Sequence, residues 1–367
     1  MSTARGGRPG VGRRLLALAA VVVAAAVLSV LVASVYEGWV LSHPPLRPVA
    51  GNPGLGAQLA YRCLPVPAAP QFCAARPLPL FTPDHHVAIP GWIVPASSGP
   101  YPGLSGGWSR STVVLVGDYG QNRTDHGPFP TWRVVTRLHA AGYNVVLFDS
   151  RATGAADGGS VGFGTIEVHD LLTVVRYLRT LGPPQGDIAL WGLGTGADAA
   201  IVAAARTRLV RAVIADSPYA TPAGFLRRAV PSWSGWPAFP FRYTIPWVLP
   251  RETGIPYRRY NPLRAVRALG TTPARPLLLV AGTTDPLAPL SDAQRLFRAS
   301  HDPRADLLPV YGAGRLQAYE KSPRQVRNGG PNVYMCHALA TLAAMRRGQG
   351  APAAAAASPC GGMSAAG

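Results

Sequence analysis

The sequence is poor in acidic residues, and it has few charged residues of either sign. It has 17 aspartates and glutamates against 35 lysines and arginines, which gives a formal net charge of +18, although only 14% of the 367 residues are charged. The basic residues are scattered and form no recognised nucleic-acid module, so we expect no nucleic-acid partner. Codon bias of a high-GC genome explains the excess of arginine, and attraction to anionic lipid headgroups or envelope polymers is the alternative.

Cysteine is scarce as well, with four residues at Cys63, Cys73, Cys336 and Cys360. None has the spacing of a zinc site, and we expect neither a metal nor a cofactor. Four cysteines allow three pairings, between which the sequence does not choose. Outside the cytoplasm, a Cys63–Cys73 bridge would stabilise the fold by ~2–4 kcal/mol, and free buried thiols are the alternative.

Charge is absent from one long stretch near the N-terminus. From Leu15 to about Val35 the chain is alanine, valine and leucine apart from serines, and ~20 such residues span a bilayer. We therefore predict a single-pass transmembrane helix, or signal anchor, at residues 15–40, inserted in the lipid bilayer with Tyr36 and Trp39 in its aromatic belt. The arginines of residues 1–14 predict a basic cytoplasmic tail, and hence a cell-membrane protein whose main domain is extracytoplasmic.

A cleaved signal peptide is the competing interpretation of this stretch, because Val32-Ala33-Ser34 is similar to a small-residue cleavage site. The apolar core of a signal peptide is usually shorter, ~7–15 residues, so the length favours an anchor. The two interpretations differ in whether the mature domain stays attached to the membrane.

The rest of the chain predicts one α/β domain with extensions. Residues 41–77 are rich in proline and glycine and predict a linker, and residues 347–367 predict a disordered tail. Residues 78–346 predict a mainly parallel central sheet with helices on both faces. The expected strands cover residues 87–89, 91–94, 112–116, 144–148, 187–191, 212–215, 277–281 and 307–310, the first two at an antiparallel edge, and the expected helices cover residues 131–141, 167–180, 197–207, 291–299 and 334–345.

An insertion interrupts this alternation at residues 221–262. It is rich in proline and in aromatic residues, among them Trp233, Trp236, Phe239 and Trp247. Insertions of this kind lie over the carboxyl ends of the strands, where α/β proteins bind ligands. We interpret it as a cap, or lid, over a pocket for a hydrophobic or acyl ligand, and a purely structural cap is the alternative.

The segment from Ile188 to Gly196, IALWGLGTG, leads from an apolar strand through glycines into an alanine-rich helix. In the Gly-x-Ser-x-Gly nucleophile elbow, the flanking glycines permit a tight turn that lifts a serine above the sheet. Here the central position is Gly194, which has no side chain to act as a nucleophile. We expect the turn to be present without its chemistry.

Several motifs, in this order, resemble those of the α/β-hydrolase family, in particular membrane-tethered serine hydrolases that carry FGxxE before a WGxSxG elbow. The matching segments are GWIVP at 91–95, DSRATG at 149–154, GFGTIE at 162–167, DSPY at 216–219 and GTTDP at 282–286. The resemblance spans residues 78–346 and implies an α/β-hydrolase fold with a cap insertion. It also implies a serine–histidine–acid triad and two backbone N–H groups that bind an oxyanion.

Carried over position by position, the triad is incomplete. The acid is retained as Asp285, the nucleophile position is Gly194, and the histidine position in GAGR is Arg315. Arginine stays protonated and is not a base. The oxyanion-hole positions are Tyr119 and Thr195. We expect Arg315 either to pair with Asp285 or to point to solvent.

The oxyanion loop, GDYG at 117–120, carries a further change, because Asp118 would place a negative charge where one has to be stabilised. Three altered parts of one site predict a catalytically inactive pseudoenzyme that binds a ligand or a partner. The alternative is an active ester, thioester or peptide hydrolase with a non-standard catalytic site. Candidate substitutes for the missing groups are Thr195, whose side chain is turned away at this position of an elbow, Ser217, His169, His301, His337 and, as metal ligands, His85 and His86.

Overall fold

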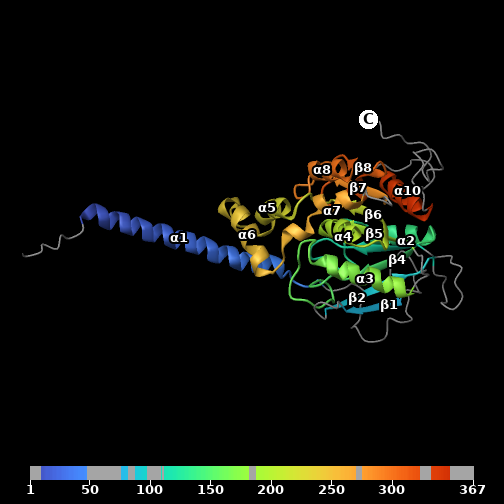
Figure 1. The fold of residues 1–367 in the computed structure, drawn as a ribbon, viewed down its shortest axis with the longest axis horizontal. Helices are drawn as coiled ribbons and strands as arrows, with labels where there is room; N and C mark the ends of the chain where they lie inside the picture. Colours follow the sequence, from blue (N-terminus) through green and yellow to red (C-terminus); the bar gives the residue numbers. More distant parts are fainter. Residues whose placement is uncertain are drawn as a thin grey trace, which may run out of the picture.

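The computed structural model describes residues 10–47, 76–81, 87–96, 109, 111–181, 187–269, 275–322 and 332–347. Within them, one long helix projects from an α/β body (Figure 1). Outside them lie most of the expected linker, the expected tail beyond residue 347, and the residues His85, His86, Cys63, Cys73 and Cys360. The fourth cysteine, Cys336, is described and is disulfide-bonded.

Strands of the described chain form one sheet in the order β1-β2-β4-β3-β5-β6-β7-β8. From β4 onward the neighbours are parallel, whereas β1 and β2 are antiparallel to the strands beside them. The central strands are buried on both faces, which explains their continuous apolar sequences. The bounds are β1 (Arg76–Phe81), β2 (Ala88–Val94), β3 (Ser111–Val116), β4 (Asn144–Phe148), β5 (Asp187–Leu193), β6 (Val210–Asp216), β7 (Leu277–Gly282) and β8 (Ala305–Val310).

The expectation of two short early strands at 87–89 and 91–94 is wrong at one point. Both belong to the single strand β2, whose antiparallel partner is β1. Pro90 does not break β2, because a proline lacks only the N–H donor, and its carbonyl oxygen still accepts a hydrogen bond from the Asp149 amide at 2.9 Å.

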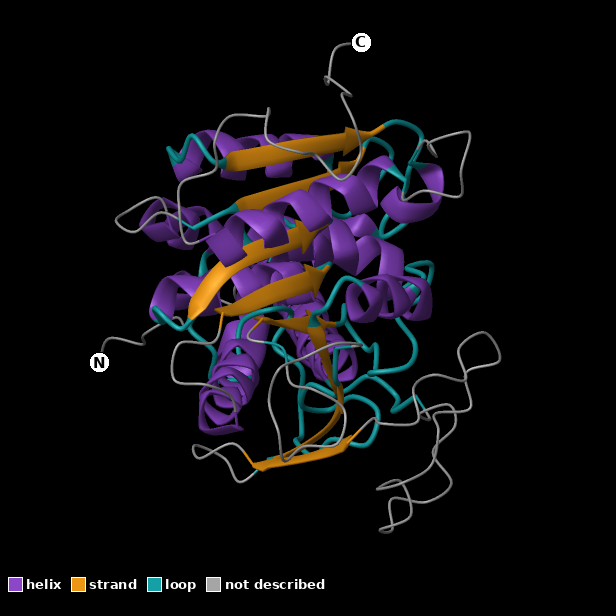
Figure 2. Cartoon of the chain, turned by 90° about the vertical axis from the view of Figure 1, so that its right-hand side faces the viewer, coloured by secondary structure: helices purple, strands orange, loops and turns teal. Residues whose placement is uncertain are grey.

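Helices cover both faces of the sheet, as expected (Figure 2). Side chains of α3, α4, α7 and α8 pack on one face, and those of α2, α9 and α10 pack on the other. Helix α7 was not among the expected helices. The bounds are α2 (Thr131–Ala140), α3 (Glu167–Leu181), α4 (Thr195–Arg206), α7 (Pro262–Leu269), α8 (Leu290–Ser300), α9 (Ala318–Lys321) and α10 (Val333–Arg347).

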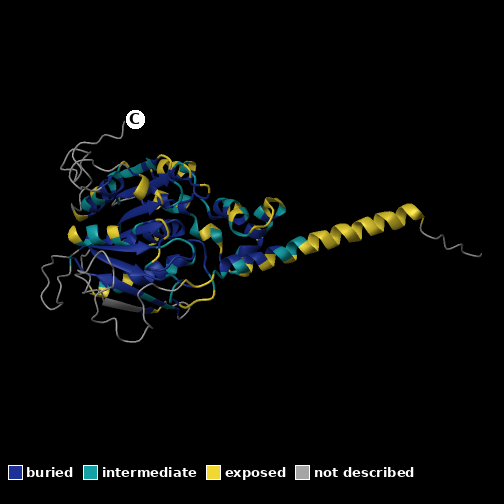
Figure 3. Ribbon diagram, turned by 180° about the vertical axis from the view of Figure 1, so that it is seen from behind, coloured by how far each residue is buried: buried dark blue, intermediate teal, exposed yellow. Residues whose placement is uncertain are grey.

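The insertion at 221–262 forms two helices, α5 (Pro222–Trp233) and α6 (Ala238–Glu252), followed by a short 3-10 helix, η3 (Tyr257–Tyr260). Beside them runs α1 (Val11–Ser42), which is 32 residues long and is apolar enough to cross a membrane by length and composition. Figure 3 shows α1 exposed over most of its length and buried only where it meets the body. The cap therefore includes the end of α1 as well as the insertion.

Candidate functional site

The elbow turn is formed as the sequence predicts, with glycine at its centre. Gly194 lies between β5 and α4 with φ 54° and ψ −118°, a positive φ that strains any residue with a side chain. The flanking glycines are required by close packing, since a Cβ at Gly192 would lie 2.3 Å from the carbonyl oxygen of Gly196. The tight turn is thus kept without its nucleophile.

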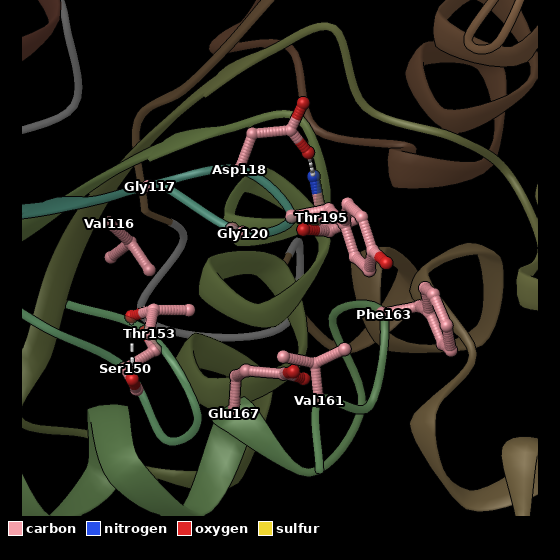
Figure 4. A pocket seen from close by; sticks show the side chains of 12 residues that line it. Val116, Gly117, Asp118, Gly120, Ser150, Thr153, Val161, Phe163, Glu167 and Thr195 are labelled. Carbon is pink, nitrogen blue, oxygen red and sulfur yellow. Dashed lines mark hydrogen bonds between the residues drawn. The ribbon is translucent and has the colours of Figure 1, made fainter. Parts of the chain in front are cut away.

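The carboxylate of Asp118 occupies the space beside the elbow. A Cβ placed on Gly194 would lie 2.2 Å from both Cγ and Oδ1 of Asp118. The same Oδ1 accepts a hydrogen bond from the backbone N–H of Thr195 at 2.8 Å (Figure 4). That N–H is the donor which, in an elbow of this kind, would bind the oxyanion of a tetrahedral intermediate. A carboxylate of the chain itself therefore takes the place of both the serine side chain and the oxyanion.

Arg315 holds this carboxylate in position. Its Nε lies 2.7 Å from Oδ2 of Asp118 and its Nη2 lies 2.8 Å from Oδ1, which is a bidentate ion pair. Its Nη1 lies 3.7 Å from Oδ2 of Asp285, close enough for an ion pair without a hydrogen bond. Arg315 thus points into the site and not to solvent, and its main partner is Asp118, with Asp285, the partner expected from the sequence, farther away.

Asp285 is fixed by the backbone, as a triad acid would be. Its Oδ1 accepts hydrogen bonds from the amides of Leu287 at 2.8 Å and Ala288 at 3.0 Å, and its side chain is fully buried. Burial raises the pKa of Asp285, and the nearby charge of Arg315 offsets part of that rise. The acid position therefore has the geometry of a triad acid, but Asp285 faces the guanidinium of Arg315 rather than an imidazole.

The pKa values show how strongly the site favours this charge arrangement. Burial alone would raise the pKa of Asp118, but the charge and hydrogen bonds of Arg315 and the amides of Thr195 and Tyr119 outweigh it, and the pKa lies below its ordinary value. Burial would lower the pKa of Arg315, but Asp118 and Asp285 raise it overall. Both groups stay charged, so neither accepts or supplies a proton at ordinary pH.

Tyr119 joins the oxyanion loop to the end of α1. Its hydroxyl donates to the carbonyl oxygen of Leu41 at 2.7 Å, and its ring stacks on Phe163 and Trp233 with centroid distances of 5.3 and 4.4 Å. The side chain of Leu41 is buried in the same cluster beneath the cap. The pocket between this loop and Phe163 has room for about one water molecule (Figure 4). Leu41 and the rings of Tyr119, Phe163 and Trp233 thus fill this part of the space under the cap.

The other resembling motifs hold loops at this edge of the sheet. Asp149 pairs with buried Arg123 at 2.5 Å. Arg151 pairs with buried Asp170 through its guanidinium and its backbone N–H. The carboxylate of Glu167 accepts the amides of Gly162 at 2.5 Å and Gly164 at 3.0 Å. These ion pairs and backbone hydrogen bonds give the charged residues of the motifs a structural role in holding the loops.

Three candidate substitute catalysts, Ser217, His169 and His337, are engaged in other contacts. The hydroxyl of Ser217 is buried, donates to Asp216 at 3.0 Å and accepts the Leu316 amide at 3.2 Å. The ring of His169 contacts the hydroxyl of Tyr260 at 2.7 Å, and His337 contacts Asp306 at 2.5 Å. None of these contacts reaches the elbow.

Similarity to other proteins supports the fold more than the chemistry. No protein-family model matches the chain. It is 24% identical over 231 residues to the uncharacterized protein YfhR of Escherichia coli K12, over 62% of this chain and 69% of that protein. It is 27% identical over 169 residues to the uncharacterized protein YqkD of Bacillus subtilis, over 45% and 53% of the two chains.

Among solved structures, the esterase Pf2001 of Pyrococcus furiosus matches over 75% of this chain and 92% of its own, with a TM-score of 0.54 and 20% identity. The chain has an α/β-hydrolase fold. Within that fold, the elbow, the acid turn and the oxyanion loop occupy the carboxyl edge of the sheet, where Gly194, Asp285 and Asp118 meet.

The ion pair of Asp118 with Arg315 is the feature that sequence reasoning missed. Both positions were singled out, but as separate losses, the first as an unfavourable charge and the second as a missing base. Two opposite charges at two positions of one α/β-hydrolase site were a signal that they compensate each other.

Proposed function

We propose that this chain is a membrane-anchored pseudohydrolase: an α/β-hydrolase-fold protein that does not hydrolyse esters and that acts by binding a ligand or a partner. The observation that carries the proposal is the contact of the Asp118 carboxylate with the Thr195 amide, at 2.8 Å. It occupies the oxyanion hole with a negative charge that belongs to the chain. A substrate carbonyl would have to displace a carboxylate that Arg315 holds with two more hydrogen bonds.

Each step of acyl transfer lacks its group at this site. Attack on a carbonyl needs a nucleophile, and Gly194 has none. Deprotonation of a nucleophile needs a base near neutral pH, and Arg315 remains a cation. Stabilisation of the tetrahedral intermediate needs free N–H donors, and the Thr195 amide is already bonded. Because each of these three requirements of the reaction is unmet, we expect a rate near that of the uncatalysed reaction.

Membrane anchoring is the second part of the proposal. It is supported by α1, whose exposed surface is apolar from Leu15 onward. The disulfide at Cys336 supports a location of the domain in an oxidising compartment, outside the cytoplasm. The arginines before α1 favour a cytoplasmic N-terminus.

The binding role is compatible with the filled cap. Leu41 and the stacked rings of Tyr119, Phe163 and Trp233 occupy the space in which an acyl ligand would lie. A hydrophobic or acyl ligand under the cap would therefore have to displace the end of α1. A partner that contacts the outside of the cap would need no such movement.

The test uses the full chain in detergent micelles, fluorophosphonate labelling and esters of short and long acyl chains. The restored variant carries Asp118→Ala, Gly194→Ser and Arg315→His, and the matched control carries only the last two changes. We expect the natural chain and the control to be silent. The restored variant should gain at least about tenfold in rate, because an oxyanion donor alone contributes roughly 10²-fold or more.

One result would count against the absence of activity, and two would count against the role of Asp118. Labelling of the natural chain, or ester hydrolysis by it that Asp285→Ala abolishes, would establish an enzyme with a substitute nucleophile. A restored variant that is folded yet silent would show that Asp118 is not what blocks the site. Equal activity of the restored variant and its control would lead to the same conclusion.

A further inference from the structure

The cap contacts α1 at a level that lies inside the expected membrane span. The hydroxyl of Ser34 donates to that of Thr244 in α6 at 2.7 Å, and Val30 and Ala33 pack on the apolar cluster beneath the cap. Trp236 adds a hydrogen bond from its indole N–H to Glu37 at 2.9 Å. Helix α6 is thus attached to the last third of α1.

The length of α1 leaves no gap between this contact and the bilayer. The exposed, uncharged part of α1 runs from Leu15 to Ser29, about 15 residues or roughly 22 Å of helix. A hydrocarbon core of ~30 Å takes ~20 residues, so a span that begins at Leu15 ends near Ser34. The last of these residues are already covered by the cap. An untilted or moderately tilted α1 therefore brings α6 down to the boundary between acyl chains and headgroups.

The outer surface of α6 has the composition of a membrane interface. Phe239, Tyr243 and Trp247 have exposed fractions of 78%, 52% and 54%, unusually high values for large aromatic side chains. Tyr243 and Trp247 are four residues apart in the helix and so share one side of it. The exposed aromatic residues of α1 at the same level are Tyr36 at 62% and Trp39 at 55%.

Arginines accompany these rings. The guanidinium of Arg251 lies 4.1 Å from the ring centroid of Trp247, and those of Arg242 and Arg227 lie 5.4 and 5.9 Å from that of Tyr243. Aromatic rings at headgroup depth with arginines beside them are typical of surfaces that bind anionic bilayers.

We propose that the outer face of α6, defined by Phe239, Tyr243, Trp247, Arg242 and Arg251, lies in the headgroup region of the bilayer that α1 crosses. The inference rests on the proposed anchoring by α1. It commits to lipid as the occupant, because α1 itself delivers this face to the membrane. The domain is then held at two points, by a span and by an interfacial helix, and its orientation on the membrane is fixed.

The test places the full chain in nanodiscs that contain a photoactivatable phospholipid, with or without anionic lipid, and maps the crosslinks by mass spectrometry. We expect crosslinks in residues 15–35 and also in residues 239–251, the latter several-fold stronger with anionic lipid. Residues near Leu181, which is 39% exposed at the far end of α3, serve as the internal reference and should remain unlabelled.

A double variant, Tyr243→Glu with Trp247→Glu, should lower crosslinking at residues 239–251 several-fold and leave that of residues 15–35 unchanged, whereas Leu181→Glu should change neither. Crosslinks in residues 15–35 without any in residues 239–251 would overturn the inference and keep the anchor. Absence of crosslinks from both would overturn the anchor as well. Crosslinking of residues 239–251 that falls with rising protein concentration, and does not respond to the lipid composition, would overturn the inference and assign the face to a second copy of the chain.

Discussion

Arg315 binds the Asp118 carboxylate through Nε and Nη2, at 2.7 and 2.8 Å, across 197 positions of the sequence. The same carboxylate accepts the Thr195 amide. In a serine hydrolase, the position of Arg315 carries the histidine of a hydrogen-bonded triad, and the amide at the position of Thr195 is free to bind an oxyanion. Here an ion pair and a backbone hydrogen bond join Arg315, Asp118 and Thr195, and the low pKa of Asp118 and the raised pKa of Arg315 keep both side chains charged.

Removing the acid of this ion pair should destabilise the fold. Asp118→Ala leaves the nearly buried guanidinium of Arg315 with only the more distant Asp285, and breaking a buried pair in this way costs about 3–5 kcal/mol. Glu320→Ala is the matched control, because it breaks the exposed pair with Arg133, which has the same distance of 2.7 Å, and exposed pairs contribute ~0–1 kcal/mol. Unfolding of the detergent-solubilised chain measures both, and equal losses would contradict the prediction.

A side chain at the elbow centre should conflict with Asp118. Gly194→Ala adds a Cβ at positive φ and 2.2 Å from the carboxylate, so we expect a loss of stability of several kcal/mol. Gly235→Ala is the control, because Gly235 has φ 70° and nothing within 4 Å of an added Cβ, which leaves backbone strain of roughly 1–2 kcal/mol alone.

The conflict predicts non-additivity as well. In the background of Asp118→Ala, the further change Gly194→Ala should cost markedly less than it does in the natural chain, because the carboxylate is gone. Gly235→Ala should cost the same in both backgrounds. A Gly194→Ala cost that is independent of Asp118 would mean that strain, and not contact, dominates at the elbow.

Local sequence signals were enough to predict the fold. The continuous apolar strands, the glycines of the elbow and the ordered motifs predicted a parallel sheet covered on both faces, which the structure confirms. They also predicted which residues face the site. Asp285, Gly194 and Arg315 do meet, because the fold brings the carboxyl ends of β5, β7 and β8 to one edge.

Long-range pairings were not predictable in the same way. Arg315 had two acids within reach, and only the conformation of the oxyanion loop, where the Asp118 amide binds the side-chain oxygen of Gln121 at 2.8 Å, decides which is closer. The contact of α1 with α6 joins Ser34 to Thr244, which are 210 positions apart in segments that carry no shared motif. The composition of α1 predicted lipid on all sides, and its few polar residues, Ser34 and Glu37 among them, were the only sign of a protein neighbour.

The buried ring of His126 should make stability sensitive to mild acid. Burial lowers the pKa of His126 to about 4, against a small opposing effect of Asp125. The ring is neutral in the folded chain, and the unfolded chain protonates near pH 6.5, so folding is penalised as pH falls from ~6.5 towards 4. At pH 5 this penalty is about 2 kcal/mol. His126→Gln should be less stable than the natural chain at pH 7.5, and the difference between them should shrink at pH 5; parallel pH profiles would contradict the assignment.

The packing of α1 on the cap predicts that two leucines of one helix behave differently. Leu41 is 5% exposed inside the cap cluster, whereas Leu28 is 61% exposed. Leu41→Ala should lower the stability of the detergent-solubilised chain by about 2–5 kcal/mol, because it leaves a cavity between Tyr119 and the cap. Leu28→Ala should change it little, since detergent surrounds that side chain before and after the change and alanine is a good helix former. Thermal unfolding of the two variants distinguishes them, and a Leu41→Ala variant as stable as Leu28→Ala would mean that the end of α1 does not pack against the cap in solution.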